Sequence, residues 1–142
     1  MNTAAYSQTP LAKKLGIKDG FIIRLINQPA HYFSLFTDFP VEIKIENDQT
    51  IKKNFIHFFT IEENELKQQL GLLKSELLPN GMIWVSWAKK TAKVKSDITE
   101  DVIRNYALSI GLVDIKVCAI DEMWSGLKLV IPIKHRIVAG KR

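Results

Sequence analysis

The sequence has little cysteine and no long hydrophobic run: Cys118 is its single cysteine. One cysteine excludes a framework of internal disulfides and is typical of a reducing compartment. No segment approaches the roughly 18 consecutive apolar residues of a membrane span, and the first ten residues have neither the basic start nor the apolar core of a secretory signal. We therefore expect a cytoplasmic protein and exclude a membrane protein and a disulfide-stabilised miniprotein.

The sequence also lacks the short motifs of common catalytic and metal sites. It contains no G-x-x-x-x-G-K-[ST] phosphate loop, and Ser86 and Ser125 have no G-x-S-x-G context. No two of its three histidines have the i, i+4 spacing of a helical metal pair, and no cysteine or acid cluster completes a site. We predict no metal site and no catalytic residue, and we assign His57 and Cys118 to packed positions inside strands.

Length and composition are those of an ordinary globular domain. The chain has 142 residues, of which 46% are apolar and 25% charged. A chain of this length can bury roughly two thirds of its unfolded surface without disulfides or metals. We expect one domain over residues 1–142, with an ordered core over about 6–136 and a frayed tail at 137–142.

Positive charge is concentrated in two segments. The net charge is +5, from 20 Lys and Arg against 15 Asp and Glu. Residues 86–96 contain four lysines and residues 128–142 contain five cations, and neither segment contains an acid. Without these nine cations the balance is 11 against 15, a net charge of −4. Such patches can attract an anionic ligand, nucleic acid or an acidic protein partner, and they equally suit a solvated loop and tail.

Hydrophobic patterns predict strands that alternate with helices. Thr9-Pro10 and Gly16 bracket a short helix, and Thr60-x-x-Glu63 has the pattern of a capping box before a leucine stripe that ends at Pro79-Asn80-Gly81. Thr99 is the expected cap of a further helix that ends before Gly111. The expected strands are 21–26, 41–46, 55–59, 82–87, 113–120 and 126–133.

This alternation predicts a three-layer α/β fold with a mainly parallel, doubly wound sheet. The last two strands are joined too tightly for a crossover, so they must form an antiparallel hairpin. Residues 47–53 are short for a crossover, which leaves the pairing of strand 41–46 open.

A mainly parallel sheet that finishes in an antiparallel hairpin resembles the fold of S-adenosylmethionine-dependent methyltransferases. Leu78-Pro-Asn-Gly-Met-Ile-Trp-Val85 is similar to a helix-to-strand junction of that fold. The resemblance implies the strand order 2-1-3-4-6-5, numbered along the chain, in a trimmed, Rossmann-like sheet of about six strands.

Longer stretches resemble a bacterial family catalogued as domain of unknown function 3052. The similar segments are Thr9–Lys18, Ile83–Lys90, Asp97–Arg104 and Gly111–Asp121 with Trp124–Lys128, and the resemblance extends over most of Tyr6 to Arg136. Membership implies a small bacterial protein and carries no established activity.

The methyltransferase-like fold implies one candidate site. Its cofactor lies beside a glycine-rich turn after the first strand, and an acid about 20 residues later holds the ribose. The corresponding positions here are Asn27 and Glu46, which are 19 residues apart. However, the turn from Asn27 to His31 has no glycine, and Pro29 removes a donor. We predict no cofactor, with S-adenosylmethionine at Asn27 and Glu46 as the alternative.

A second candidate patch gathers polar and aromatic residues that the expected strand order brings to one edge of the sheet. Aromatic rings beside lysines can stack on a ligand ring and hold an anion. Alternatively, Trp84 and Trp87 pack on opposite faces of the sheet and Lys128 pairs with an acid of the last turn. The patch comprises Ser86, Trp87, Lys89, Lys90, Asp121, Glu122, Trp124, Ser125 and Lys128.

The sequence thus favours a non-catalytic binding or regulatory module on a degenerate methyltransferase-like scaffold. The first alternative is a methyltransferase with an atypical cofactor loop. The second is a nucleic-acid-binding protein that uses the basic segments 86–96 and 128–142.

Overall fold

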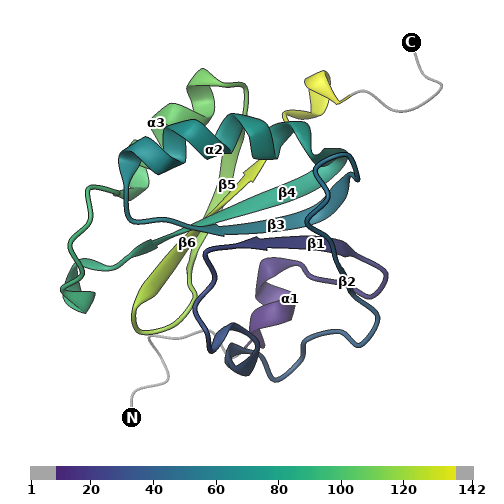
Figure 1. Cartoon of the computed structure of the whole chain (residues 1–142), viewed down its shortest axis with the longest axis horizontal. Coiled ribbons are helices and arrows are strands. Elements are labelled where there is room, and N and C mark those ends of the chain that lie inside the picture. Colours follow the sequence, from purple (N-terminus) through teal and green to yellow (C-terminus); the bar gives the residue numbers. More distant parts are fainter. Residues whose placement is uncertain (1–8, 137–142) are drawn as a thin grey trace.

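The computed structural model describes residues 9–136, which form a six-stranded sheet with helices on both faces (Figure 1). The expected order of residues 6–8 and the expected fraying of 137–142 lie outside the described residues. The spatial order is β2-β1-β3-β4-β6-β5. This order confirms the three-layer fold class and the topology expected from the sequence. The strands are β1 Ile22–Ile26, β2 Lys44–Ile45, β3 Lys53–Phe59, β4 Leu77–Ala88, β5 Val113–Ala119 and β6 Trp124–Val130.

The pairing changes from parallel to antiparallel across the sheet. β2, β1, β3 and β4 are mutually parallel, whereas β6 is antiparallel to both β4 and β5. β3 and most of β4 are buried on both faces, which explains their nearly continuous apolar sequence. The predicted hairpin of the last two strands is therefore confirmed.

Each face of the sheet has its own hydrophobic cluster. α2 (Glu63–Ser75) and α3 (Glu100–Ser109) cover one face, whereas α1 (Leu11–Leu15) lies on the other (Figure 1). Three 3₁₀ turns, η2 (Tyr32–Leu35), η3 (Lys90–Ala92) and η4 (Ile133–His135), complete the fold. Trp87 belongs to the cluster under α2 and α3, and Trp84 to the one under α1, so the two indoles pack on opposite faces as the alternative interpretation expected.

At two of the three helices, the first backbone N–H groups are bound by carboxylates far away in the sequence, which local patterns did not predict. Thr99 caps α3 as expected, since its hydroxyl accepts from the Val102 N–H at 3.2 Å. The capping box of α2 is wrong: the N-cap is Glu62, and the Glu63 N–H donates to the Asp97 carboxylate instead. At α1 the Asp38 carboxylate, 26 residues away from Ala12, accepts the first free N–H groups.

All six strands differ from their predicted bounds by at least one residue, and the differences at β2 and β4 have identifiable causes. The alternation over 41–46 produces only the two-residue edge strand β2, with Val41 94% exposed, because β1 offers pairing to Lys44 and Ile45 alone. The expected helix stop at Pro79-Asn80-Gly81 lies inside β4, which starts at Leu77. Within residues 9–136 no helix is long and apolar enough to cross a membrane.

Candidate functional site at the carboxyl edge of the sheet

The strand order reverses direction between β1 and β3. From β1 the chain moves outward to β2 and then returns to place β3 on the other side of β1. Ligands of open α/β sheets bind outside the carboxyl ends of the strands at such a switch point. A ligand site is therefore expected at the carboxyl ends of β1 and β3.

A cavity of about 260 Å³ lies at this switch point. Asn27 follows β1, Phe59 ends β3, and Trp124 begins the neighbouring antiparallel strand β6. The rings of Phe59 and Trp124 meet edge to face at 5.1 Å. We call this space the switch-point cavity; it is lined by Asn27, Phe59, Thr60, Ile61, Glu65 and Trp124.

Asn27 lies where the methyltransferase fold has its glycine-rich turn, and its side chain forms hydrogen bonds across the cavity. Its φ is +59°, a left-handed conformation that asparagine tolerates better than most residues. Its side-chain N–H₂ donates to the Phe59 carbonyl at 3.1 Å and to Glu65 at 2.8 Å. The other Glu65 oxygen accepts from the Thr60 hydroxyl at 2.8 Å. The Glu65 carboxylate is therefore fixed in orientation at the cavity wall.

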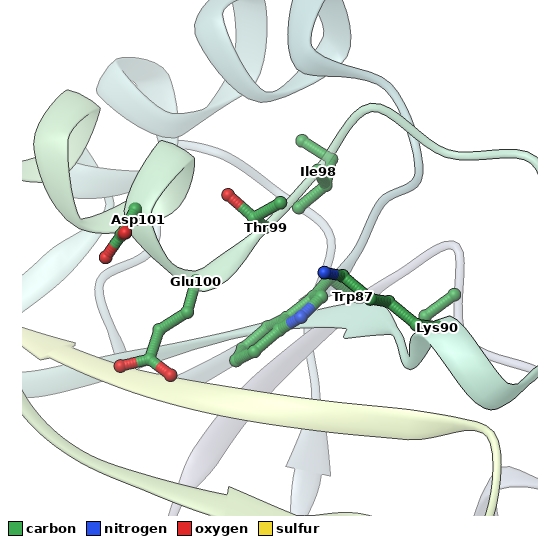
Figure 2. A pocket seen from close by; sticks show the side chains of 7 residues that line it. Trp87, Lys90, Ile98, Thr99, Glu100 and Asp101 are labelled. Carbon is green, nitrogen blue, oxygen red and sulfur yellow. The ribbon is translucent and has the colours of Figure 1, made fainter.

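Two further cavities continue along the same edge. One of about 490 Å³ shares Ile61 with the switch-point cavity. The next, of about 450 Å³, lies between the end of β4 and the start of α3, as Figure 2 shows. The former is lined by Ile61, Glu62, Lys95, Ser96 and Asp97, and the latter by Trp87, Ala88, Lys90, Ile98, Thr99, Glu100 and Asp101.

Acids outnumber lysines along these cavities. The walls carry five carboxylates, of Glu62, Glu65, Asp97, Glu100 and Asp101, against the two ammonium groups of Lys90 and Lys95. Two of the acids, Glu100 and Asp101, already pair with Arg104 on α3. The basic run 86–96 is thus interleaved with acids, so it does not form the purely basic surface that its sequence suggested.

The structure keeps apart the two residues expected to grip a nucleoside. Glu46 follows β2, and its N–H donates to the carbonyl of Ile23, near the middle of β1. It therefore lies level with Arg24, three residues or roughly 10 Å before Asn27 along the strand direction. A hydrogen bond from the Asp48 N–H holds the pKa of Glu46 below its usual value. Glu46 is therefore set back from the carboxyl end of β1, and a joint contact of Asn27 and Glu46 with one cofactor stays a prediction.

The second candidate patch is only partly assembled. Trp87, Lys90 and Trp124 line cavities at the carboxyl edge, whereas Ser86 is fully buried and hydrogen-bonded to His57 at 2.7 Å. Since Ser86 faces the core, it cannot contact a ligand as expected.

Other residues of the patch hold the β5–β6 turn together. The Lys89 ammonium donates to the Asp121 carbonyl at 2.7 Å, and the Asp121 carboxylate accepts the N–H groups of Met123 and Trp124. Ser125 pairs with Trp87 across the strands, and Glu122 is exposed in the turn. These residues shape the edge beside the switch-point cavity.

Lys128 lies away from this edge. It pairs with Trp84 on β4, three residues further from the turn than Ser125. The suggested pairing of Lys128 with Asp121 or Glu122 is absent among the described residues. Its charged neighbour is Lys116 on β5.

His57 and Cys118 have packed environments, as the sequence indicated. His57 is fully buried between the Tyr32 hydroxyl at 2.9 Å and the Ser86 hydroxyl at 2.7 Å, and burial lowers its pKa to about 3. Cys118 is half-buried, and burial raises the pKa of its thiol. Over residues 9–136 no group of histidine, cysteine and acidic side chains could hold a metal ion.

Sequence reasoning missed Glu65 and Thr60. The sequence assigns Thr60 only to the predicted capping box, and Glu65 lies two residues beyond that box in the first turn of α2. An acid there suggests only a favourable interaction with the helix dipole. The usable signal is the position of Thr60 directly after a buried strand at the switch point.

Comparison with solved structures finds several methyltransferases. A putative type 11 methyltransferase from Sulfolobus solfataricus aligns with a TM-score of 0.60 at 14% identity, over 99% of this chain and 96% of that one. The ribosomal protein L11 methylase from Lactobacillus delbrueckii subsp. bulgaricus aligns with a TM-score of 0.56 at 10% identity, over 84% and 74%.

The magnesium protoporphyrin IX methyltransferase from Synechocystis PCC 6803, solved with bound S-adenosylmethionine, aligns with a TM-score of 0.55 at 12% identity, over 85% of this chain and 76% of that chain. No protein-family model and no curated protein matches the sequence. At these identities the likeness concerns the backbone alone, and it shows that this chain has the Rossmann-like fold of the S-adenosylmethionine-dependent methyltransferases.

Proposed function

We propose that the protein is a binding module that takes a small cationic ligand at the switch-point cavity, and that S-adenosylmethionine is that ligand. The observation that carries the proposal is the place of the cavity, between the carboxyl ends of β1 and β3 where the strand order reverses. Open α/β sheets bind their ligands at this point. The solved Synechocystis methyltransferase, of the same fold, contains S-adenosylmethionine.

The chemistry of the walls suits a cation. S-adenosylmethionine carries a positively charged sulfonium and an ammonium group. Glu65 offers a fixed carboxylate, and Glu62 and Asp97 line the adjoining cavity. The rings of Phe59 and Trp124 add aromatic surface, and aromatic faces attract cations.

The residues do not reproduce the family's nucleoside grip. Asn27 and its hydrogen bonds occupy the turn where a glycine would let the backbone approach the ligand, and Glu46 lies level with Arg24. We therefore assign recognition of the ligand to Glu65 and the aromatic walls of the cavity.

Isothermal titration calorimetry with S-adenosylmethionine and S-adenosylhomocysteine tests the proposal. We expect S-adenosylmethionine to bind more tightly than S-adenosylhomocysteine, because the sulfur of S-adenosylhomocysteine is a neutral thioether and not a positively charged sulfonium. Glu65→Gln should weaken binding about tenfold, the size of one lost charge-assisted contact. Glu46→Gln is the matched control and should bind as the unchanged protein does.

Three outcomes would contradict this assignment. Absence of heat at millimolar S-adenosylmethionine would exclude the ligand. If Glu46→Gln lowered the affinity for S-adenosylmethionine more than Glu65→Gln did, Glu46 and not Glu65 would be the acid that recognises the ligand, as in the methyltransferase fold. Release of S-adenosylhomocysteine during incubation with a methyl acceptor would replace the non-catalytic proposal by the methyltransferase alternative.

We also propose membership of the bacterial family of unknown function 3052 and a cytoplasmic location. The quoted sequence segments support the former. The half-buried free thiol of Cys118, the single cysteine of the sequence, supports the latter, since free cysteines are typical of reducing compartments. Cell fractionation followed by immunodetection would test the location.

A further inference from the structure

Three lysines come together on the face of the sheet that carries α1. Lys116 on β5 and Lys128 on β6 are paired directly across the two strands, so both side chains leave the same face. Lys14 belongs to α1, whose residues Leu11, Ala12 and Leu15 pack in the same cluster as Cys118. Burial raises the pKa of the Cys118 thiol, and the charges of Lys14 and Lys116 both lower it. We call Lys14, Lys116 and Lys128 the lysine triad.

Two independent features define this face. Cys118 pairs with Gly126 on β6, the position two residues along the strand from the lysine pair and hence on the same face. Trp84, which pairs with Lys128 on β4, donates its indole N–H to the Leu15 carbonyl of α1 at 2.9 Å. The triad therefore spans three adjacent elements, α1, β6 and β5.

In the part of the chain that the structure describes, the triad has no acid paired with it. Within residues 9–136 none of its three side chains takes part in an ion pair or a hydrogen bond. Asp114, the acid of β5, pairs with Leu129 on the opposite face, where Arg104 binds it at 2.9 Å.

This arrangement opposes folding. Lys128 is partly buried, and both burial and the nearby Lys116 lower its pKa. Like charges directly opposite one another on a sheet are destabilising. An apolar side chain on β6 would remove both penalties, so the triad calls for a function other than stability.

We propose that the lysine triad binds the phosphate backbone of a nucleic acid, independently of the switch-point cavity. Unpaired lysine ammonium groups attract phosphates as point charges. Lysine is depleted in protein–protein interfaces but prominent in phosphate contacts, which favours a nucleic acid over an acidic protein.

The proposed contact is independent of base sequence. Lysine bound to phosphate oxygens fixes position without reading base edges. Phe33, the aromatic side chain with the largest exposed fraction among residues 9–136, lies in η2 and not on the β5–β6 hairpin. Among the described residues no exposed aromatic side chain of the β5–β6 hairpin offers a platform for base stacking, so affinity should depend steeply on salt.

Fluorescence anisotropy with a labelled 20-nucleotide single strand of mixed sequence tests this surface. The full chain should bind at 50 mM salt and weaken as salt rises. Lys116→Gln/Lys128→Gln should lower the affinity at least tenfold and reduce the slope of log K against log salt by about 1.4, at roughly 0.7 for each lost phosphate contact.

The matched control is Lys90→Gln/Lys95→Gln, which removes the same charge at the carboxyl-edge cavities. It should bind within about twofold of the unchanged protein, since Debye screening limits the reach of each charge to roughly 14 Å at 50 mM salt. Equal losses in the two double variants would overturn the assignment, because they would indicate net charge alone. Absence of binding at 50 mM salt would overturn it as well.

Two further measurements complete the test. Polyglutamate of equal charge should compete poorly; equal competition would assign the surface to an acidic protein instead of a nucleic acid. Lys128→Met should raise the melting temperature of the protein and lower its affinity for the oligonucleotide. A fall in melting temperature would overturn the inference that Lys128 is retained at the expense of stability. Neither result depends on S-adenosylmethionine, so failure here is distinct from failure of the cavity assignment.

Discussion

The ammonium of Lys53 lies 2.7 Å from a carboxylate oxygen of Glu76, and both residues are buried where β3 and β4 begin. The second oxygen of Glu76 accepts from Arg24 on β1 at 2.6 Å. Lys53 also donates to the Asp48 carbonyl, in the connection that follows β2. One carboxylate therefore connects the middle of β1 to the amino ends of β3 and β4, away from the carboxyl edge that holds the candidate site.

Removing the charge of Glu76 should be strongly destabilising. Glu76→Gln leaves the buried Lys53 cation without a carboxylate, and breaking a buried pair from one side costs about 3–5 kcal/mol. Lys53→Met should cost less than Glu76→Gln, because Arg24 still pairs with the acid. Urea denaturation measures the difference, and the double variant should lose less stability than the sum of the single changes. Additive losses would show that the pair is not coupled.

Burial of neutral His57 makes stability depend on pH. The folded pKa of about 3 lies below the unfolded value near 6.5, so the unfolded chain binds a proton that the folded chain does not. Stability contributed by this residue is complete above pH 6.5 and is lost as pH falls toward 3. We expect a loss of about 2 kcal/mol between pH 7 and pH 5.

Urea denaturation at pH 7, 6 and 5 measures this dependence. In His57→Gln the free energy of unfolding should change little between pH 7 and pH 5. In His31→Gln, which changes an exposed histidine, it should still fall with pH as in the unchanged protein. If His57→Gln does not fold, an NMR titration of the unchanged protein replaces it, and protonation of the folded His57 ring above pH 5 would contradict the prediction.

The strands and the closing hairpin could be predicted from patterns local to each strand, whereas the order of the strands came from the resemblance to the methyltransferase fold. The doubly buried strands have continuous apolar runs, and the short turn before β6 permits only a hairpin. The site was less accessible, since it depends on register. Glu46 has a suitable spacing in the sequence, but the pairing of Ile45 with Ile23 places it away from the end of β1. The Lys116–Lys128 pair likewise depends on a bulge in β5 that shifts the register after Asp114.

Gly81 shows how a local signal can mislead. Pro79-Asn80-Gly81 resembles a helix stop, yet Gly81 lies in β4, where a Cβ atom would come within 2.8 Å of the Lys53 carbonyl. Because two backbones meet there, Gly81→Ala should destabilise the fold by about 1–3 kcal/mol. Gly71→Ala is the control: nothing lies within 4 Å of its Cβ position on α2, so it should stabilise by about 0.5–1 kcal/mol. Thermal melts should show a lower melting temperature for Gly81→Ala and a higher one for Gly71→Ala. A change in the same direction for both variants would refute the argument that two backbones meet closely at Gly81.

Asn27 combines a backbone requirement with a side-chain role, and two substitutions separate them. Asn27→Gly keeps the left-handed conformation but loses the bonds to Phe59 and Glu65, which should cost about 1 kcal/mol. Asn27→Ala loses the same bonds and adds the penalty of a positive φ, about 1–2 kcal/mol more. Chemical denaturation should therefore rank the unchanged protein first, then the glycine variant, then the alanine variant.

The same pair of variants reports on the cavity. Removal of the Asn27 amide frees one Glu65 oxygen and widens the switch-point cavity, while the Thr60 hydroxyl still holds the other oxygen. We therefore expect Asn27→Gly to bind S-adenosylmethionine more tightly than the unchanged protein, by about threefold to tenfold, in spite of its lower stability. Weaker binding would mean that Asn27 itself contacts the ligand, and recognition would then belong to the turn after β1 and not to Glu65.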